Sequence, residues 1–567
     1  MAHTHLFAAL RRLLQRQRLA DRLEQRTGMA ATSWMAPDLP RRELLAMLAA
    51  AGVAPLVGCT KTLPGSANAA ATIGPDGLTR KAGDSGLDAQ AATTKDTGQS
   101  KNTGTIAIIG GGLAGLHCAL RLWKDHGIAA TVYEGQSRLG GRCYTDRETF
   151  KHQDGMHSEL GGEFIDSDHV VMHALCKEFD LPLLDYETGD PKLDDLVHFA
   201  LGKQWSEEDL LADWKPLGKA IAAAAAKVRK SGEMPSYRST QGAEAIDKQS
   251  MAEFLDAAKT SGALRNLVDI TFTGEFGLDP GLQSALNLID MADPSGDGID
   301  LLSGSDERYA LKGGNDALAT KLVTALPAGT VQPGHILQKL AKLSDGRYAL
   351  TLAASGTTIE VKADRVVIAL PFTALRKVEM VDLGLPAAKA KCIAELAYGT
   401  NAKLMVGFKS RLWRKAGSDG TVLTDIGFQQ CWDTSLLQSS TDAGILVNFT
   451  GGQKGVQIGM GSPANQRDAF LNQLEAVVPG AKKASTADVA RMHWPTVPWV
   501  EGSYACYKPG HYTTLRGAEG ERVGNLHFCG EHTDLPMQGF MEGAVASGKR
   551  VAQEIAGDLG LQATAQG

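Results

Sequence analysis

"TIAIIGGGLAGLHCALRLWKDHGIAATVYEGQSRLGGR" occupies residues 105–142 and decides the fold of this chain. Its first five residues are continuous, apolar and rich in β-branched side chains, which is typical of a buried parallel strand. Gly110, Gly112 and Gly115 then follow at the spacing of a G-x-G-x-x-G turn, and an apolar helix begins at Leu113 and Ala114. Strand, glycine turn and helix in this order predict the start of a Rossmann-type unit.

Each glycine in such a turn has a structural role. The first allows the tight turn, the second lets the backbone approach a pyrophosphate, and the third lets the helix pack on the strand. The free N–H groups of the helix suit a phosphate. A second strand ends at Glu134, where a carboxylate can accept hydrogen bonds from ribose hydroxyls. A purely structural glycine turn is the alternative, but the full order favours dinucleotide binding.

A second glycine pair follows at once, as Arg138-Leu139-Gly140-Gly141-Arg142. A nicotinamide-binding Rossmann domain does not need this pair, whereas FAD proteins of the glutathione-reductase type carry an R-x-G-G-R near the diphosphate. A solvated basic turn is the alternative. Together with the first motif, this pair favours FAD over NAD.

Composition excludes some classes of protein. The 567 residues are too many for one ordinary core, so two or more domains are expected. With 58 basic and 64 acidic residues the formal charge is −6, so we expect no nucleic-acid partner. The eight cysteines form no C-x-x-C pair or zinc-like spacing, which predicts isolated buried thiols and no metal site, with one or two disulfides as the alternative.

Residues 1–59 form an N-terminal extension. Paired arginines at 41 and 42, a short apolar run over residues 44–57 and then Cys59 resemble a twin-arginine export signal that ends in a lipoprotein-type cysteine. Pro40 and Glu43 depart from that pattern. Export from a bacterium, to the periplasm or to a membrane through a lipid anchor at Cys59, is therefore expected. If residues 38–58 are instead an ordinary helix, the protein is cytoplasmic. Residues 60–103 lack an apolar period and predict a disordered linker.

The far end of the chain carries a second distinctive segment. "LHFCGE" predicts a short strand that ends at Gly530 and Glu531, and "QGFMEGAVASGKR" predicts a helix that opens at Gly539, Phe540 and Met541. A helix N-terminus bears partial positive charge. Aimed at a flavin, it would stabilise the negative charge of the reduced ring.

The two ends together resemble the flavin amine oxidase family, which includes monoamine oxidases, polyamine oxidases and L-amino-acid oxidases. The matching stretches are IAIIGGGLAGL, VYEGQSRLGGR, SELGGEFI, GGNDALATKL, VVIALPFTALR, AKLMVGFKSRLWRK and LHFCGEHT with QGFMEGAVASG. The resemblance implies an α/β fold in which a glutathione-reductase-like, Rossmann-type FAD-binding domain is built from discontinuous segments and an α+β substrate domain is inserted.

The implied organisation is as follows. FAD-binding segments cover residues 104–165, 310–375 and 496–556, substrate-domain segments cover 166–309 and 376–495, and a tail covers 557–567. The expected FAD-binding residues are Gly110, Gly112, Leu113, Ala114, Gly115, Glu134, Arg138, Gly140, Gly141, Arg142, Gly161, Gly162, Gly530, Glu531, Gly539, Phe540 and Met541.

The resemblance also implies a reaction. An amine passes a hydride from its α-carbon to flavin N5, and the resulting imine hydrolyses, with hydrogen peroxide formed when O2 is the electron acceptor. Lys403 stands where the family keeps a lysine near flavin N5, and a solvent-facing lysine is the alternative. Tyr504 and Phe540 match the aromatic pair that walls the amine slot, where two tyrosines are usual; simple core packing is the alternative.

Cofactor attachment and substrate class follow less directly. Ser503 occupies the position of the flavin-linking cysteine of monoamine oxidases, so we expect non-covalent FAD, although Cys506 lies nearby. Glu163 lies near the arginine that pairs with the substrate carboxylate in L-amino-acid oxidases. An acid there favours an ammonium group, unless Glu163 salt-bridges an arginine or faces solvent. An amino acid gripped by another arginine, such as Arg308 or Arg376, is the rival.

The main hypothesis is therefore an FAD-dependent amine oxidase that uses O2 or another electron acceptor, acts on a small amine or amino acid, and forms a homodimer. An L-amino-acid oxidase or dehydrogenase, a carotenoid-type desaturase and a non-catalytic flavin-binding protein are the alternatives.

Overall fold

The computed structural model describes residues 104–561, apart from residues 154, 191, 194–195, 295–298, 303–304 and 439–441. The chain separates into two units, Met1–Asn102 and Thr103–Gly567, and the description concerns the second. The predicted export signal, the lipid anchor at Cys59 and the linker lie outside the described residues. None of the described helices has the length and apolar character of a membrane span.

A five-stranded parallel sheet carries the glycine turn. Its strands stand in the order β22-β13-β1-β2-β9 and are drawn from three distant parts of the chain. They are β1 Ile106–Ile109, β2 Thr131–Glu134, β9 Val331–Pro333, β13 Arg365–Ile368 and β22 Leu526–Phe528. All four residues of β1 are buried, as expected for a central strand between two parallel neighbours.

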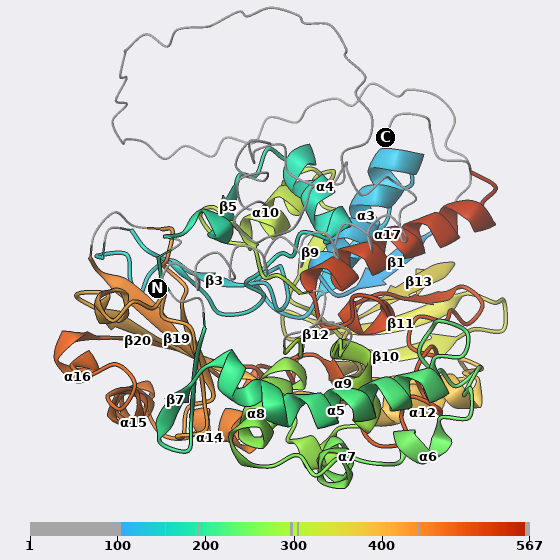
Figure 1. The fold of residues 1–567 in the computed structure, drawn as a ribbon. Helices are drawn as coiled ribbons and strands as arrows, with labels where there is room; N and C mark the ends of the chain where they lie inside the picture. Colours follow the sequence, from blue (N-terminus) through green and yellow to red (C-terminus); the bar gives the residue numbers. More distant parts are fainter. Residues whose placement is uncertain are drawn as a thin grey trace, which may run out of the picture. The chain divides into compact units, whose positions relative to one another are not determined.

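Helices α3 (Leu113–His126) and α17 (Met541–Asp558) lie side by side against this sheet, although they come from opposite ends of the described chain (Figure 1). α3 ends at Gly127, which adopts the left-handed conformation that closes many helices. Two shorter helices join this layer, α4 (Val170–Glu178) and α10 (Ala317–Thr324). The predicted mixed α/β class with a parallel sheet is confirmed.

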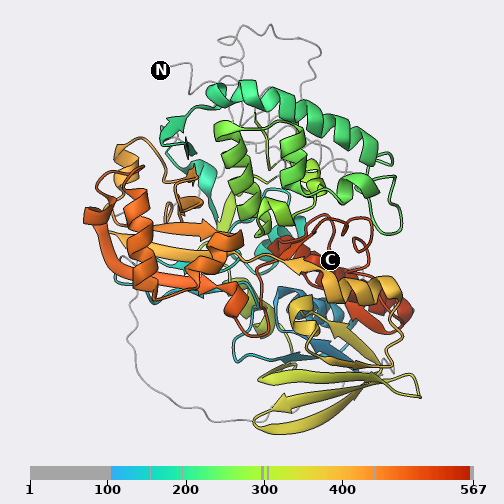
Figure 2. The same cartoon turned by 90° about the horizontal axis from the view of Figure 1, so that it is seen from below.

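A four-stranded sheet, ordered β12-β11-β10-β14, lies at one end of the described unit (Figure 2). Its strands are β10 His335–Lys342, β11 Tyr348–Ala354, β12 Thr357–Ala363 and β14 Glu379–Val381. β14 lies beyond residue 375, the predicted end of the second FAD-binding segment, and pairs with β10. The domain bounds given above otherwise remain predictions.

The largest sheet has seven strands in the order β20-β16-β19-β18-β17-β6-β7. They are β6 Val197–Ala200, β7 Lys203–Trp205, β16 Ala402–Phe408, β17 Val422–Thr424, β18 Gln430–Asp433, β19 Gly444–Thr450 and β20 Ser485–His493. β16 is buried along its whole length because β20 and β19 pair with it on either side.

Helices α8 Gly262–Phe276, α14 Gly452–Ile458 and α15 Pro463–Leu474 pack on this seven-stranded sheet, in an α+β arrangement. The remaining α-helices of the described residues are α5 Glu207–Val228, α6 Glu244–Asp247, α7 Met251–Ala257, α9 Ala285–Met291, α11 Phe372–Leu375, α12 Ala387–Glu395, α13 Leu412–Lys415 and α16 Ala481–Ala484. α5 begins with a capping box between Ser206 and Asp209, which satisfies two otherwise free N–H groups.

Short elements connect the sheets. They are the strand pairs β3 Thr145–Asp146 with β4 Ser158–Glu159, β5 Leu183–Asp185 with β8 Tyr309–Leu311 and β15 Ala397–Tyr398 with β21 Ala505–Cys506, and the 3₁₀ helices η2 Tyr186–Thr188, η3 Pro280–Leu282, η4 Trp494–Thr496 and η5 Glu531–Thr533. The seven described cysteines are buried and free, which confirms the prediction of isolated buried thiols for those seven.

The contact between α3 and α17 yields a stability prediction. A Cβ atom at Gly548 would lie 2.3 Å from the Ala114 carbonyl oxygen, so the two helices touch through their backbones. G548A should therefore force the helices apart and lower the free energy of unfolding by about 1–3 kcal/mol, measured by urea denaturation.

Gly557 of the same helix supplies the matched control, because nothing lies within 4 Å of a Cβ atom placed there. G557A should leave stability unchanged or raise it by up to ~1 kcal/mol, since alanine is the better helix former. Equal effects of the two substitutions would contradict close packing at Gly548.

Candidate functional site

The glycine turn after β1 leaves a backbone surface without side chains. Gly110 has a φ of 115°, which favours glycine, and a Cβ atom at Gly115 would lie 2.0 Å from the Gly110 carbonyl oxygen. Gly112 is the N-cap residue of α3 and supplies no capping side chain. The N–H groups of Leu113 and Ala114 therefore stand at an open helix end that suits an anion.

Glu134 ties the end of β2 to this turn. One carboxylate oxygen accepts a 2.7 Å hydrogen bond from Gly111 N–H, and the other accepts a 2.8 Å bond from Gln136 N–H. The side chain is buried. Ionised carboxylates accept more than one bond at each oxygen, so these bonds orient Glu134 and leave further acceptor positions.

The R-L-G-G-R segment packs directly on the glycine turn. Gly140 N–H donates to the Gly111 carbonyl at 2.9 Å, and a Cβ atom at Gly141 would lie 3.2 Å from Gly112 Cα. Arg138 donates to three carbonyls of its own loop and lies over the Tyr144 ring, so its guanidinium shapes the loop. The two glycine-rich segments thus form one surface.

Arg142 connects that surface to the C-terminal segment. Its guanidinium donates to the Ser503 carbonyl at 2.6 Å and to the Glu531 carboxylate at 2.8 Å. The second Glu531 oxygen accepts a 2.9 Å bond from Gly539 N–H, just before α17 begins. Residues predicted to bind FAD from opposite ends of the chain are therefore joined by hydrogen bonds.

The start of α17 is a second open helix end. Phe540 is the N-cap residue and supplies no capping side chain, and Met541 opens the helix with its side chain against Gly162. Gly530 N–H is held by Ser547 of the same helix at 2.9 Å. The helix N-terminus, with its partial positive charge, lies beside the segment that holds Gly161 and Gly162.

Lys403, the second residue of β16, points into this region and is not solvent-exposed. Its Nζ donates to Glu163 Oε2 at 2.6 Å, to the Gly161 carbonyl at 2.9 Å and to the Glu159 carbonyl at 3.2 Å. Both side chains of the ion pair are less than 10% exposed. Lys403 and Glu163, which were predicted to be separate catalytic and substrate residues, therefore bind each other.

Tyr504 and Phe540 are half-buried and come from segments that meet at Gly539, where a Cβ atom would lie 3.8 Å from the Tyr504 ring. Tyr504 Oη donates to the Gly274 carbonyl at 2.8 Å, and Phe540 packs edge-on against His169 with ring centroids 5.2 Å apart. Each ring is thus fixed by a different element.

Sequence reasoning missed several acidic groups here. Burial raises the pKa of Glu159 to about 8 and that of Glu275 to about 7. Loss of water around the Glu307 carboxyl raises its pKa to about 7, although part of this residue is exposed. The negative charges of Glu275 and Glu307 both influence Tyr504, which places the three groups in one region. No spacing or motif of the sequence marks Glu275 or Glu307.

Glu307 is held in an unusual backbone conformation. Its φ is 43°, a region that residues other than glycine rarely adopt, and its N–H donates to Asp166 at 3.0 Å. Asp166 also belongs to a group with Asp168 and His169 whose possible ligand atoms all lie within 4.8 Å of one another. His169 Nδ1 accepts from Asp166 N–H, so these side chains brace the loop.

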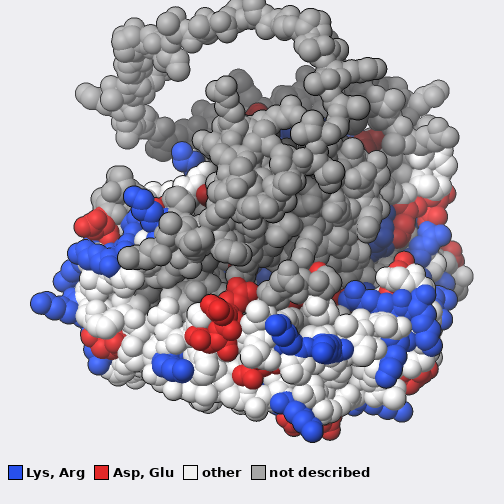
Figure 3. Space-filling view, viewed as in Figure 1, with Lys and Arg blue, Asp and Glu red and all other residues white. Residues whose placement is uncertain are grey.

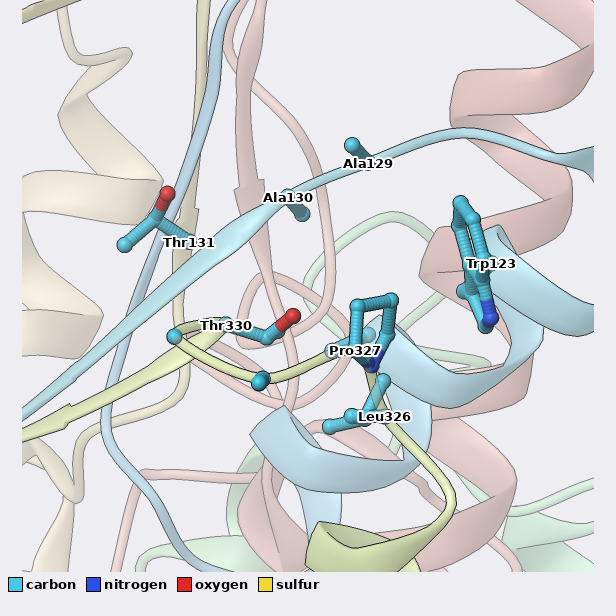
Figure 4. A pocket seen from close by; sticks show the side chains of 10 residues that line it. Trp123, Ala129, Ala130, Thr131, Leu326, Pro327 and Thr330 are labelled. Atoms are coloured by element: carbon cyan, nitrogen blue, oxygen red, sulfur yellow. The ribbon is translucent and has the colours of Figure 1, made fainter. Parts of the chain in front are cut away.

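A separate hollow of about 300 Å³ lies elsewhere on the described unit, lined by Ala119, Trp123, Thr131, Leu326, Pro327 and Thr330 among others (Figure 4). Thr131 begins β2, whereas the glycine turn follows the end of β1. Because these strands are parallel, the hollow lies at the opposite edge of the sheet from the turn. It is no part of the candidate site.

On the face of the described unit that Figure 3 shows, lysine and arginine as well as aspartate and glutamate are exposed, so both signs of charge occur on this face.

The family described as flavin containing amine oxidoreductase matches residues 113–556. A flavin-containing amine oxidase of Oncorhynchus mykiss is 25% identical over 81% of this chain and 87% of its own. An L-amino-acid oxidase of Siganus canaliculatus is 24% identical over 83% of this chain and 89% of its own.

Solved structures share the fold. Cyclohexylamine oxidase from Brevibacterium oxydans IH-35A has a TM-score of 0.68 at 21% identity, covering 81% of this chain and 99% of that chain. Putrescine oxidase bound to putrescine has a TM-score of 0.66 at 21% identity, covering 80% of this chain and 99% of that chain.

The raised pKa of Glu159 yields a pH prediction. Its carboxyl holds a proton up to about pH 8 in the folded chain, whereas an ordinary glutamate titrates near ~4.3 in the unfolded chain. The folded state therefore binds more protons between these values, and this group's contribution to stability declines as pH rises, by at most ~1.4 kcal/mol per pH unit.

E159Q removes that titration, so its free energy of unfolding should fall less between pH 5 and pH 8 than the wild-type value, measured by urea denaturation without cofactor. E360Q, which alters an exposed carboxylate on β12, should decline with pH like the wild type. Parallel curves for E159Q and wild type would refute the assignment.

Proposed function

Because the chain belongs to the flavin-containing amine oxidoreductase family, we propose that it binds FAD and oxidises a C–N bond of a small amine. When bound, the flavin supplies the acceptor for the hydride of the amine's α-carbon. The imine then hydrolyses to a carbonyl compound and ammonia or an amine. The carrying observation is the chain of contacts that runs from Gly112 through Gly141 and Arg142 to Glu531 and Gly539, between the uncapped starts of α3 and α17.

The residues present suit an FAD molecule. The diphosphate would take the N–H groups at the start of α3, beside Gly112 and Gly141, where no side chain intrudes. Glu134 would take ribose hydroxyls with its remaining acceptor positions. The N-terminus of α17 would face the ring and stabilise its reduced, negatively charged form.

Attachment is proposed to be non-covalent. Ser503 carries a hydroxyl at the position where a cysteine thiol would link the flavin. Its Oγ donates a 2.6 Å hydrogen bond to Asn401 Oδ1. Cys506 is buried on β21, and burial raises the pKa of its thiol to about 12. Because the thiolate is the reactive form, such a thiol is a poor nucleophile for a flavin.

An amine is a better substrate for this site than an amino acid. The two arginines proposed to grip a carboxylate are engaged elsewhere: Arg308 forms a bidentate pair with Asp185, and Arg376 donates to the carbonyls of Ile393 and Leu396. An amino-acid carboxylate would meet acidic residues without either of these counter-charges.

Two carboxylates support a cationic substrate. Among the described residues, Glu275 and Glu307 have no hydrogen bond or ion pair to their side chains. Glu275 lies in the last turn of α8, where the helix dipole already disfavours an anion. A second ammonium group on the substrate would relieve both penalties, which favours a diamine.

Tyr504 and Phe540 would wall the amine slot, exclude water and offer π faces to the nitrogen. A protein of this family could pass electrons to O2, which gives hydrogen peroxide, or to another electron acceptor. Export to the periplasm, with Cys59 as a lipid anchor, and a homodimeric state also remain proposals.

An anaerobic titration tests the proposed reaction. The purified protein, loaded with FAD, should lose its yellow absorbance on mixing with primary amines or diamines and recover it when air is admitted, with one hydrogen peroxide formed per amine. L-amino acids should bleach it poorly. Bleaching by L-amino acids alone would identify an amino-acid oxidase, and bleaching without peroxide a dehydrogenase.

If neither amines nor L-amino acids bleach the flavin, two alternatives are left. One is a carotenoid-type desaturase, which a polyene substrate would test, and the other is a flavin-binding protein without turnover. Either result would overturn the amine oxidase. A protein that stays colourless after incubation with FAD would overturn the cofactor as well.

The diamine preference rests on separate residues. E307Q and E275Q should each raise KM for a diamine by about tenfold, because a charge-assisted contact contributes ~1.5–3 kcal/mol, while KM for a monoamine of similar length changes little. E360Q is the control, since that carboxylate is exposed on β12. Equal changes for both amines would contradict a second cation site.

A further inference from the structure

The pair between Lys403 and Glu163 is a short, buried ion pair near the proposed active site. Their closest atoms lie 2.6 Å apart, and both side chains are almost wholly buried. Lys403 belongs to the central strand β16, and Glu163 belongs to the loop that follows β4. The pair therefore joins the seven-stranded sheet to the segment beside the parallel sheet.

Lys403 has no free donor in this arrangement. A protonated amine carries three N–H groups, and Nζ makes three bonds, to Glu163 Oε2, to the Gly161 carbonyl and to the Glu159 carbonyl. A lysine that passed protons to a water molecule would have to release one of them first.

Glu163 is equally occupied. Its Oε1 accepts from Trp432 Nε1 at 2.9 Å and from Thr434 Oγ1 at 2.7 Å, while Oε2 accepts from Lys403. The Trp432 ring also lies 5.4 Å from Lys403 Nζ, within reach of a cation–π contact. Trp432 in β18 thus contacts both members of the pair, and Thr434, which follows β18, bonds Glu163.

The pair adjoins the residues proposed to hold the cofactor. The Gly161–Gly162 segment that accepts from Lys403 is bonded to Arg142, whose carbonyl accepts from Gly162 N–H at 3.2 Å. Met541, the first residue of α17, lies against Gly162. This glycine segment therefore contacts the ion pair on one side and Arg142 and Met541, which are proposed to adjoin FAD, on the other.

We propose that Glu163 is a positioning residue that fixes Lys403 and compensates its charge, so that the two act as a rigid, electrically neutral unit. This inference rests on the proposed function. It replaces two simpler roles, Glu163 as the receptor for the substrate ammonium and Lys403 as a mobile proton carrier. Both of those roles would require breaking bonds that the buried pair already makes.

The charge of each partner has an opposite consequence for a bound flavin. Reduction adds negative charge to the ring, so a nearby uncompensated cation favours the reduced form and an uncompensated anion disfavours it. E163Q should therefore raise the midpoint potential of bound FAD, and K403M should lower it. The double variant E163Q/K403M, which is neutral again, should return close to the wild-type value.

The experiment measures midpoint potentials by dye equilibration for the four FAD-loaded proteins. T434V is the matched control, because it removes one hydrogen bond from Glu163 but leaves both charges, and it should leave the potential near the wild-type value. Shifts of the same sign in E163Q and K403M would overturn the proposal, since they would report general disruption. If E163Q does not fold, the comparison of K403M with the double variant still isolates the charge of Glu163.

Steady-state kinetics separate the two roles of Glu163. If Glu163 is a positioning residue, E163Q should change KM for the amine less than threefold. The double variant E163Q/K403M should then have the same steady-state rates as K403M alone. A rise in KM of tenfold or more, with the potential unchanged, would make Glu163 the substrate receptor and overturn the inference.

Failure of the proposed function is a distinct result, because a protein without bound FAD would give no potential at all. The pair itself would then be tested by urea denaturation of the same variants. E163Q and K403M should each lower the midpoint, and the double variant should lose less than the two losses combined. Simple additivity would show that the two residues do not act as a unit.

Discussion

Backbone contact through glycine is the constraint on which the rest of the structure depends. The turn after β1 and the helices α3 and α17 approach their neighbours so closely that side chains at Gly115 or Gly548 would collide with main-chain atoms, and a side chain at Gly141 of the R-L-G-G-R loop would crowd Gly112. Because these approaches leave the surface bare, N–H groups and helix ends can face a ligand directly. Arg142 and Glu531 then lock the N-terminal and C-terminal parts of that surface together.

Electrostatics gives the surrounding region its chemical character. Glu159, Glu275 and Glu307 all have pKa values raised by loss of surrounding water, so the region carries fewer negative charges than its composition suggests when no cation is present. The cations of this region are already matched, Lys403 by Glu163 and Arg142 by Glu531. A positively charged substrate would ionise the remaining acids as it entered, which couples its binding to proton release.

The sequence predicted those parts of the site whose geometry is local. The glycine turn, Glu134 and the R-L-G-G-R loop lie within one strand–helix–strand unit, and their spacing implies their positions. Lys403 was found only through family resemblance, because alternation along β16 does not say which face is buried. Its partner could not be predicted, since contact between Lys403, Glu163 and Trp432 depends on strand order and on a loop from a distant segment. Glu275 and Glu307 carry no local signal at all.

One contact at the start of α17 has a consequence for how the molecule is made. Both carboxylate oxygens of Glu542 cap the free N–H groups of Val171 and Met172, so α4 is closed by a residue near the other end of the chain. β22, which follows the other four strands of the parallel sheet in the sequence, likewise completes that sheet by pairing with β13. While the ribosome is still synthesising the chain, the nascent protein lacks both parts and leaves an edge of β13 and an end of α4 without their partners. Folding of this unit can therefore finish only after β22 and α17 have been synthesised, and a nascent chain stalled before α17 is a natural client for chaperones or proteases.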